Sequence, residues 1–171
     1  MAERVRERKR EPEPQESVYD QHMKLLNERA RKRAEGRIII NGAEIDFLQN
    51  RQSFVKSLLN VNDWDNVGVP YWSIFTQVIK TQSGRHTHQG GVYIFVLDGK
   101  GYTLVDGERY DWEKGDLLLL PIQPGGCEHQ HFNEDPDKPA VWIGFWFASM
   151  WDAIGQTVVQ REEHPDWRKA K

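Results

Sequence analysis

Apolar residues follow two different periods along the chain. Between Val18 and Glu35 they recur every three or four positions, the spacing of an amphipathic helix, and Gly36 stands where a helix end is expected. After Gly36 they alternate with polar residues or form short runs, which predicts strands. The runs that we interpret as strands are residues 38–40, 72–79, 92–97, 102–105, 117–120 and 141–147.

Short glycine-containing turns separate several of these strands. Asp98 with Gly99, and Asp106 with Gly107, have the composition of tight turns between antiparallel neighbours. No helical pattern lies between the strands, so the predicted fold class is all-β, a small antiparallel β-barrel or double-stranded jelly roll. The expected segments are a disordered charged tail at 1–17, a helix at 18–36, the barrel at 37–150, and a C-terminal part at 151–171 with a short helix at 151–160.

Composition narrows the class of function. The chain has 171 residues, enough for one domain, and 23 Lys and Arg oppose 26 Asp and Glu, a net charge of -3. That balance disfavours binding to nucleic acid or to an anionic membrane surface, and no apolar run is long enough for a membrane span. The N-terminus lacks the apolar block of a secretion signal, and the single cysteine, Cys127, suits a reducing compartment. We therefore expect a cytoplasmic protein.

Two pairs of histidines carry the candidate chemistry. His86 and His88 are two positions apart just before a strong strand, and His129 and His131 repeat that spacing. Residues i and i+2 of a strand face the same side, so two such pairs can converge on one metal ion inside a barrel. Imidazole binds iron, zinc, nickel, copper and manganese. Histidine pairs are also common on surfaces, and their spacing alone does not decide between these interpretations.

The residues around both pairs form two longer motifs. The first consists of Gly84, His86, His88 and Gly99. The second consists of Gly115, Pro121, Pro124, Gly126, His129 and Asn133, with three additional residues between its halves. Together they resemble the two motifs of the cupin superfamily over residues 84–133. The resemblance implies a cupin fold with His86, His88 and His129 as metal ligands.

Val92 departs from the cupin pattern, because most metal-binding cupins have a glutamate ligand at this place. One interpretation is a metal-free binding or isomerising cupin, and the other is a site of three histidines. The presence of all three histidines favours the second. Within that group the chain looks most like one module of the gentisate 1,2-dioxygenase-like proteins, which implies Fe(II), O₂ and a hydroxylated aromatic acid.

The resemblance thus implies a non-haem Fe(II) dioxygenase that cleaves a C–C bond of a small chelating substrate, a hydroxylated aromatic acid or a diketone. Mn, Ni, Cu or Zn could occupy the same three histidines. The alternative is a non-catalytic small-molecule-binding or regulatory cupin. Three neutral imidazoles leave the charge of a divalent ion uncompensated, which favours an anionic bidentate substrate. We also expect a homodimer or higher homo-oligomer, with residues 38–40 as a swapped or edge strand.

Other residues could complete the site. By alternation His131 faces inward, either as a base near the metal, as a further ligand or as a hydrogen-bonded core residue. The remaining candidates are Gln77 and Tyr93 for catalysis, and Arg85, Tyr102, Trp142 and Trp146 for substrate binding. Arg85 could hold a substrate carboxylate, although alternation beside His86 points it outward.

Overall fold

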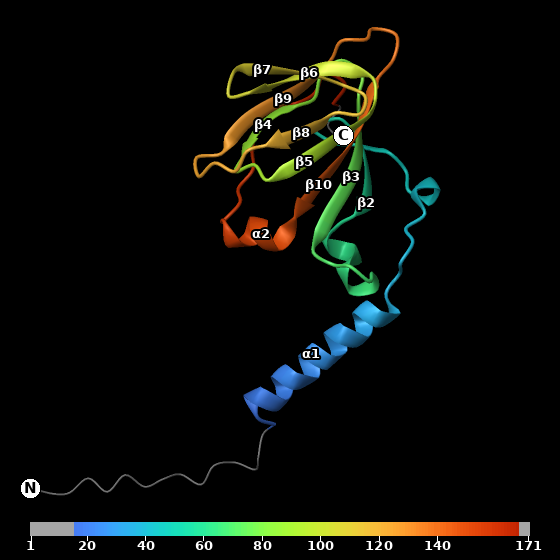
Figure 1. Cartoon of the computed structure of the whole chain (residues 1–171), viewed down its shortest axis with the longest axis vertical. Helices are drawn as coiled ribbons and strands as arrows, with labels where there is room; N and C mark the ends of the chain where they lie inside the picture. Colours follow the sequence, from blue (N-terminus) through green and yellow to red (C-terminus); the bar gives the residue numbers. More distant parts are fainter. Residues whose placement is uncertain (1–15, 168–171) are drawn as a thin grey trace, which may run out of the picture.

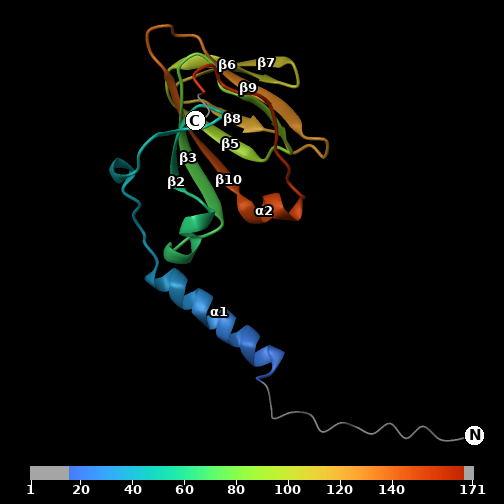
Figure 2. The same cartoon turned by 180° about the vertical axis from the view of Figure 1, so that it is seen from behind.

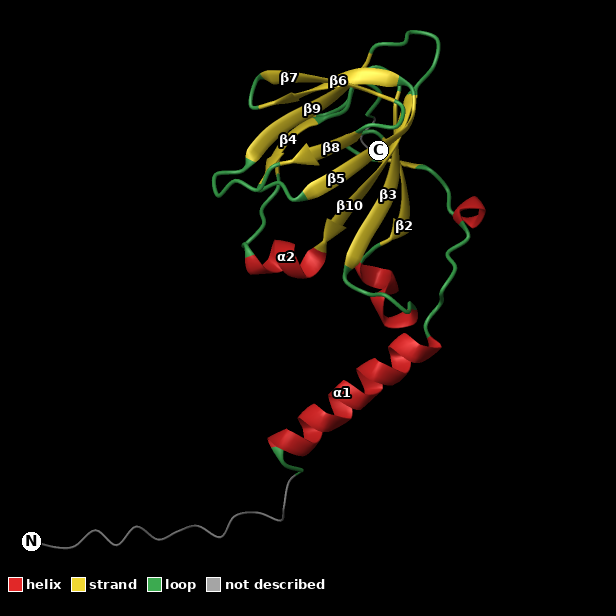
Figure 3. Cartoon of the chain, in the orientation of Figure 1, coloured by secondary structure: helices red, strands yellow, loops and turns green. Residues whose placement is uncertain are grey.

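The strands build two antiparallel sheets (Figure 3). The structure is a computed structural model and describes residues 16–167. The strands are β1 (Leu48–Gln49), β2 (Phe54–Leu59), β3 (Trp72–Ile79), β4 (Arg85–His88), β5 (Val92–Asp98), β6 (Lys100–Val105), β7 (Glu108–Glu113), β8 (Leu117–Leu120), β9 (Cys127–Asn133), β10 (Ala140–Phe147) and β11 (Val159–Glu162). The helices are α1 (Val18–Glu35) and α2 (Ala148–Ala153), with short 3₁₀ helices at Gly42–Glu44 and Val61–Asn66.

The strand order is that of a jelly roll. One sheet has the order β1-β2-β3-β10-β5-β8 and the other the order β11-β4-β9-β6-β7, and each pair of neighbouring strands is antiparallel. The prediction of an all-β double-stranded jelly roll is confirmed. The two sheets stay separate and do not close into one barrel.

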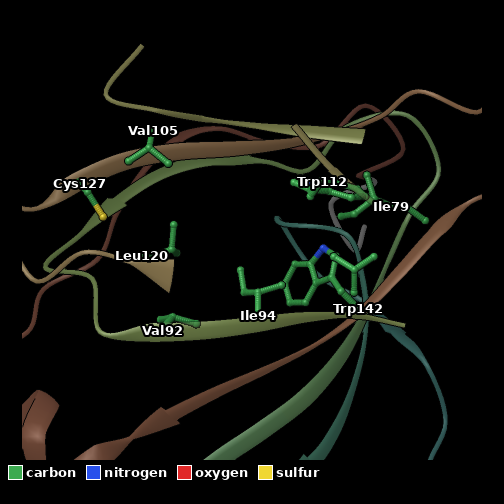
Figure 4. Packing of buried hydrophobic residues seen from close by; sticks show 10 residues of the cluster. Ile79, Val92, Ile94, Val105, Trp112, Leu120, Cys127 and Trp142 are labelled. Atoms are coloured by element: carbon green, nitrogen blue, oxygen red, sulfur yellow. The ribbon is translucent and has the colours of Figure 1, made fainter. Parts of the chain in front are cut away.

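The hydrophobic core fills the space between the sheets (Figure 4). On β5 the inward side chains of Val92, Ile94 and Val96 are at most 5% exposed, because alternate residues of a strand face the same side. Trp142 of β10 and Leu120 of β8 pack beside them. Burial of each such side chain stabilises the fold by roughly 1.5–3 kcal/mol, so this core can hold the sheets while polar residues occupy one end of the same space.

Helix α1 extends away from the sheets in both views (Figures 1 and 2) and has the bounds that its apolar spacing predicts. The Ser17 side chain accepts a hydrogen bond from the backbone N–H of Asp20 and caps the helix. A Cβ on Gly36 would lie 2.3 Å from the carbonyl carbon of Val67, so this close approach requires glycine. None of the helix residues is buried. Most of the predicted tail at 1–17 lies outside the described residues.

Two sequence predictions are wrong. Residues 38–40 form no strand, because no sheet edge lies beside them, and a single bridge between Arg37 and Val67 is the pairing in this stretch. The predicted helix at 151–160 begins and ends earlier, as α2, since Gly155 with φ 63° breaks it. Residues Val159–Glu162 beyond it form β11, which pairs with β4. No helix within residues 16–167 is long and apolar enough to cross a membrane.

Candidate metal centre

Strands β4 and β9 bring three imidazoles together. His86 is paired with His129 across the two strands, and His88 faces the same side as His86 because it lies two positions along β4. One ring nitrogen from each of the three lies within 4.8 Å of the others. Ring centroids are 4.2 Å apart for His86 and His129, 4.6 Å for His88 and His129, and 5.1 Å for His86 and His88. The predicted clustering of these histidines is confirmed.

The second ring nitrogens of the cluster differ in their partners. Nδ1 of His129 lies 3.2 Å from the carbonyl oxygen of Cys127 and can donate to it, which leaves Nε2 free to ligate. Nδ1 of His88 accepts a hydrogen bond of 2.9 Å from the backbone N–H of Gly90, so ligation through Nε2 requires that contact to be released. Nδ1 of His86 is buried and has no partner within residues 16–167.

Burial keeps the three imidazoles neutral. It is the main cause that lowers the pKa of His86 to about 2, of His88 to about 3 and of His129 to about 4, from an ordinary value of 6.5. For His86 and His88, the positive charge that neighbouring histidines would carry lowers the pKa further. Neutral imidazole is the form that binds metal. The donor set, its spacing and the unpartnered nitrogen of His86 therefore fit a divalent metal ion.

His131 lies beside this cluster rather than in it. Its ring centroid is 5.6 Å from that of His129, and its Nδ1 is 2.8 Å from the Thr103 hydroxyl oxygen. The Trp112 indole N–H donates to the same oxygen at 2.9 Å. Because an indole can only donate, the Thr103 proton is free to point at Nδ1 of His131, which leaves Nε2–H of His131 as a donor. Burial lowers the pKa of His131 well below its ordinary value.

A cavity of about 360 Å³ opens beside the cluster. His131, Gln77, Trp142 and Trp146 line it, as does Val92, whose side chain offers no ligand atom. Sequence reasoning missed Ser73, Phe75 and Trp151, which also belong to the wall. Alternation along β3 could have identified the first two, because Gln77 shares their face.

Three predicted substrate or catalytic residues lie outside this cavity. The Arg85 guanidinium points outward to the carboxylates of Glu128 and Glu162, at 3.3 and 3.5 Å. Tyr93 is 50% exposed, since it alternates with the inward Val92 and Ile94 of β5. The Tyr102 ring stacks on Phe132 at 4.6 Å instead. The prediction that these three residues lie at the site is wrong, because each side chain lies on the outer face of its strand.

Comparison with known proteins agrees with this geometry. Residues 74–146 match the family profile of the cupin domain, and this stretch includes all three clustered histidines. This part of the chain is thus similar to a cupin domain. Its fold also resembles that of salicylate 1,2-dioxygenase from Pseudoaminobacter salicylatoxidans, in a mutant complexed with gentisate, with a TM-score of 0.54 and 20% identity over 86% of this chain and 39% of that one.

Curated proteins similar to this chain include dioxygenases. Gentisate 1,2-dioxygenase from Ralstonia sp is 37% identical over 59 residues, which are 34% of this chain and 16% of that protein. Acireductone dioxygenase from Phaeosphaeria nodorum is 27% identical over 88 residues, 48% of this chain and 49% of that protein. The chain thus spans less than half the length of each.

Proposed function

We propose that this cupin is a non-haem Fe(II) dioxygenase that cleaves a C–C bond of a small chelating substrate, a hydroxylated aromatic acid or a diketone. The observation that carries the proposal is the group of His86, His88 and His129 at the wall of a cavity that Val92, which has no ligand atom, also lines. Three protein ligands leave positions for both a bidentate substrate and O₂. The dioxygenase relatives support the reaction class.

The three histidines would hold the metal through one ring nitrogen each. When bound, Fe(II) supplies the redox chemistry by which O₂ oxidises a chelated substrate, so that one C–C bond breaks and both oxygen atoms enter the product without an external reductant. The chain itself provides a low-polarity pocket. Trp142 and Phe75 meet edge to face at 5.7 Å on its wall and help to exclude water.

His131 and Gln77 are the proposed polar groups that act on the substrate. The Thr103 and Trp112 hydrogen bonds orient the His131 ring, and its Nε2–H can donate to an oxygen of the bound substrate as negative charge develops there. Gln77 is 4% exposed and lines the cavity from β3. Its amide can orient a substrate carbonyl or hydroxyl group.

The proposal includes an assembly of two or more copies. Tyr93 and Phe95 of β5 are paired with Leu119 and Leu117 of β8, and these four outward side chains are 39–56% exposed. A contiguous apolar surface of this kind is typical of contacts between proteins. Ile38 and Ile39, which are 94% and 82% exposed, add a second apolar segment near α1.

Metal analysis and oxygen uptake test the proposal together. Purified protein should retain about one Fe per chain, and anaerobic reloading with Fe(II) should restore it. Addition of hydroxybenzoates or β-diketones should then shift the absorption of the metal before O₂ is admitted, and O₂ uptake should depend on the substrate. Metal-free protein that binds such molecules without O₂ uptake would support the alternative, a non-catalytic binding or regulatory cupin.

A further inference from the structure

His88 lies at the end of its strand, unlike the other two histidines of the cluster. His86 lies within β4, opposite His129, whereas His88 is the last residue of β4. Gly90 and Gly91 follow it with φ of 80° and 71°, a region that other residues rarely adopt. Because glycine has the greatest backbone freedom, the position of His88 depends on what holds the turn after it.

The Gln156 side chain holds this turn at two points. Its Oε1 accepts a hydrogen bond of 2.7 Å from the backbone N–H of Gln89, the residue directly after His88. Its Nε2 donates to the carbonyl oxygen of Gly90 at 3.3 Å. Gln156 is partly buried, where a hydrogen bond meets less competition from water. One amide thus fixes the main chain on both sides of the peptide unit that joins Gln89 to Gly90.

This support matters most when His88 ligates a metal. The backbone N–H of Gly90 donates to Nδ1 of His88, and ligation through Nε2 requires that contact to be released. The turn then loses an internal hydrogen bond, while the two contacts of Gln156 involve other backbone groups and can remain. Thr157 exchanges two hydrogen bonds with the Gln89 side chain, at 2.8 and 3.0 Å, but these do not reach the main chain of the turn.

Gln156 is brought to the turn by the end of α2. Its backbone N–H donates to the carbonyl oxygen of Trp151 at 3.0 Å. The Trp151 ring lies beside that of His88, with centroids 5.3 Å apart. Backbone hydrogen bonds with residues 120 and 123 hold the turn from elsewhere in the chain. His88 is therefore supported from two parts of the chain, and the part after α2 uses the Gln156 amide.

We propose that Gln156 is a positioning residue of the metal site, whose amide holds the turn after His88 so that this imidazole can ligate together with those of His86 and His129. This role requires the metal site of the proposed function, but neither its substrate nor its reaction. Residues that hold a ligand in place typically change metal affinity by roughly 10–100-fold. Gln156 acts through the main chain and not on the imidazole itself, so we expect an effect of about tenfold.

Release of Co(II) tests this role in the full-length protein. Gln156→Met removes the amide at nearly the same length, and excess chelator should then remove Co(II) about ten times faster than from wild type. The visible absorption of the bound Co(II) should also change, because it reports the arrangement of the ligands. Gln160→Met is the matched control and should leave both measurements unchanged. Gln160 also follows α2, but its amide contacts Gln52 and backbone carbonyl groups outside the turn.

A double-mutant cycle tests whether the effect passes through His88. In a His88→Ala background, Gln156→Met should change the affinity for Co(II) by less than about twofold, because the ligand that it positions is gone. A tenfold loss in both backgrounds would overturn the role. So would a Gln156→Met protein that binds and releases Co(II) like wild type, or equal effects of Gln156→Met and Gln160→Met.

Failure of the proposed function gives different results. Wild-type protein that takes up no Co(II) would refute the metal site itself, and this role with it. Wild-type protein that binds Co(II), but as the Fe(II) form consumes no O₂ with any chelating substrate, would refute the dioxygenase alone. The role of Gln156 would then still be decided by the release of Co(II).

Discussion

His86 on β4 lies directly opposite His129 on β9, and their ring centroids are 4.2 Å apart. The cluster is therefore fixed by the pairing of two strands and does not depend on a loop. His88 joins it from the same face of β4. Because the apolar core holds the sheets together, loss of one imidazole removes a ligand without removing a strand.

Single substitutions should distinguish the histidines that bind the metal from a histidine that only lies beside it. Metal affinity should fall by more than about 100-fold in each of the variants His86→Ala, His88→Ala and His129→Ala. Loss of a ligand should cost more than loss of a residue that only hydrogen-bonds to a ligand, which typically lowers affinity roughly 10–100-fold. Circular dichroism should show the β fold in all three. His131→Ala is the matched control and should retain the metal, measured by elemental analysis. Equal metal loss in that control would mean that four histidines bind.

Thr103 should act by positioning the His131 ring. Thr103→Val leaves Nδ1 of His131 and the Trp112 indole N–H without a partner, at a cost of about 1–3 kcal/mol for each buried group. We expect unchanged metal content and a lower kcat by about tenfold, since the ring nitrogen that donates is no longer fixed. Thr103→Ser should restore kcat. Stability that falls with unchanged kcat would indicate a purely structural contact.

Much of the fold follows from local patterns. The period of the apolar residues located α1, β3 and β8 at their observed bounds, since each pattern is regular and ends at a clear boundary. Residues 38–40 are three β-branched isoleucines but form no strand, because strand formation needs a partner edge that only the tertiary structure can supply. β7 (Glu108–Glu113) was missed, since five of its six residues are exposed and it lacks an apolar run.

The site was predictable where alternation decides the direction of a side chain. The motifs identified three histidines that the structure brings together, and alternation on β5 explains both the inward Val92 and the outward Tyr93. Trp151 could not be placed in the wall from sequence. It reaches the cavity because α2 folds back beside His88, with ring centroids 5.3 Å apart, and that contact joins elements far apart in the chain.

Acid should destabilise the metal-free protein. The pKa of His129 is lowered to about 4 and that of His88 to about 3, so the unfolded chain takes up protons below about pH 6.5 while the folded chain stays neutral there. The free energy of unfolding is therefore fully retained above that pH and falls as the pH drops toward the folded pKa values. For each such histidine the loss between about pH 7.5 and about pH 5 is roughly 2 kcal/mol.

Urea unfolding at the two pH values measures this dependence. His88→Gln removes one titrating group and should reduce the difference in the free energy of unfolding between the two pH values by about 2 kcal/mol. His22 on α1 is exposed, and His22→Gln provides a control for the His→Gln substitution itself. A wild-type protein that is equally stable at both pH values would contradict the prediction that the buried histidines stay neutral.

The outer surface of β5 and β8 should mediate assembly. Leu117→Lys with Leu119→Lys places two charges on the exposed apolar face and should lower the mass in solution, measured by light scattering at micromolar concentration. Deletion of residues 2–16 should leave the number of chains in the assembly unchanged, because that charged sequence offers little apolar surface to bury. A wild-type protein that is strictly monomeric would rule out the assembly.

Val92→Glu tests the proposal that three histidines alone hold the metal. The Val92 side chain is 5% exposed and lines the cavity that the histidines also line, so Val92→Glu adds a carboxylate to that cavity. We expect tighter metal binding, because the carboxylate compensates one positive charge, and a fall of about tenfold or more in substrate-dependent O₂ uptake, because a position needed for the substrate is occupied. Val92→Gln adds nearly the same volume without charge and should not tighten metal binding. If O₂ uptake in the glutamate variant stayed unchanged or rose, the vacant fourth position would not be what admits the substrate.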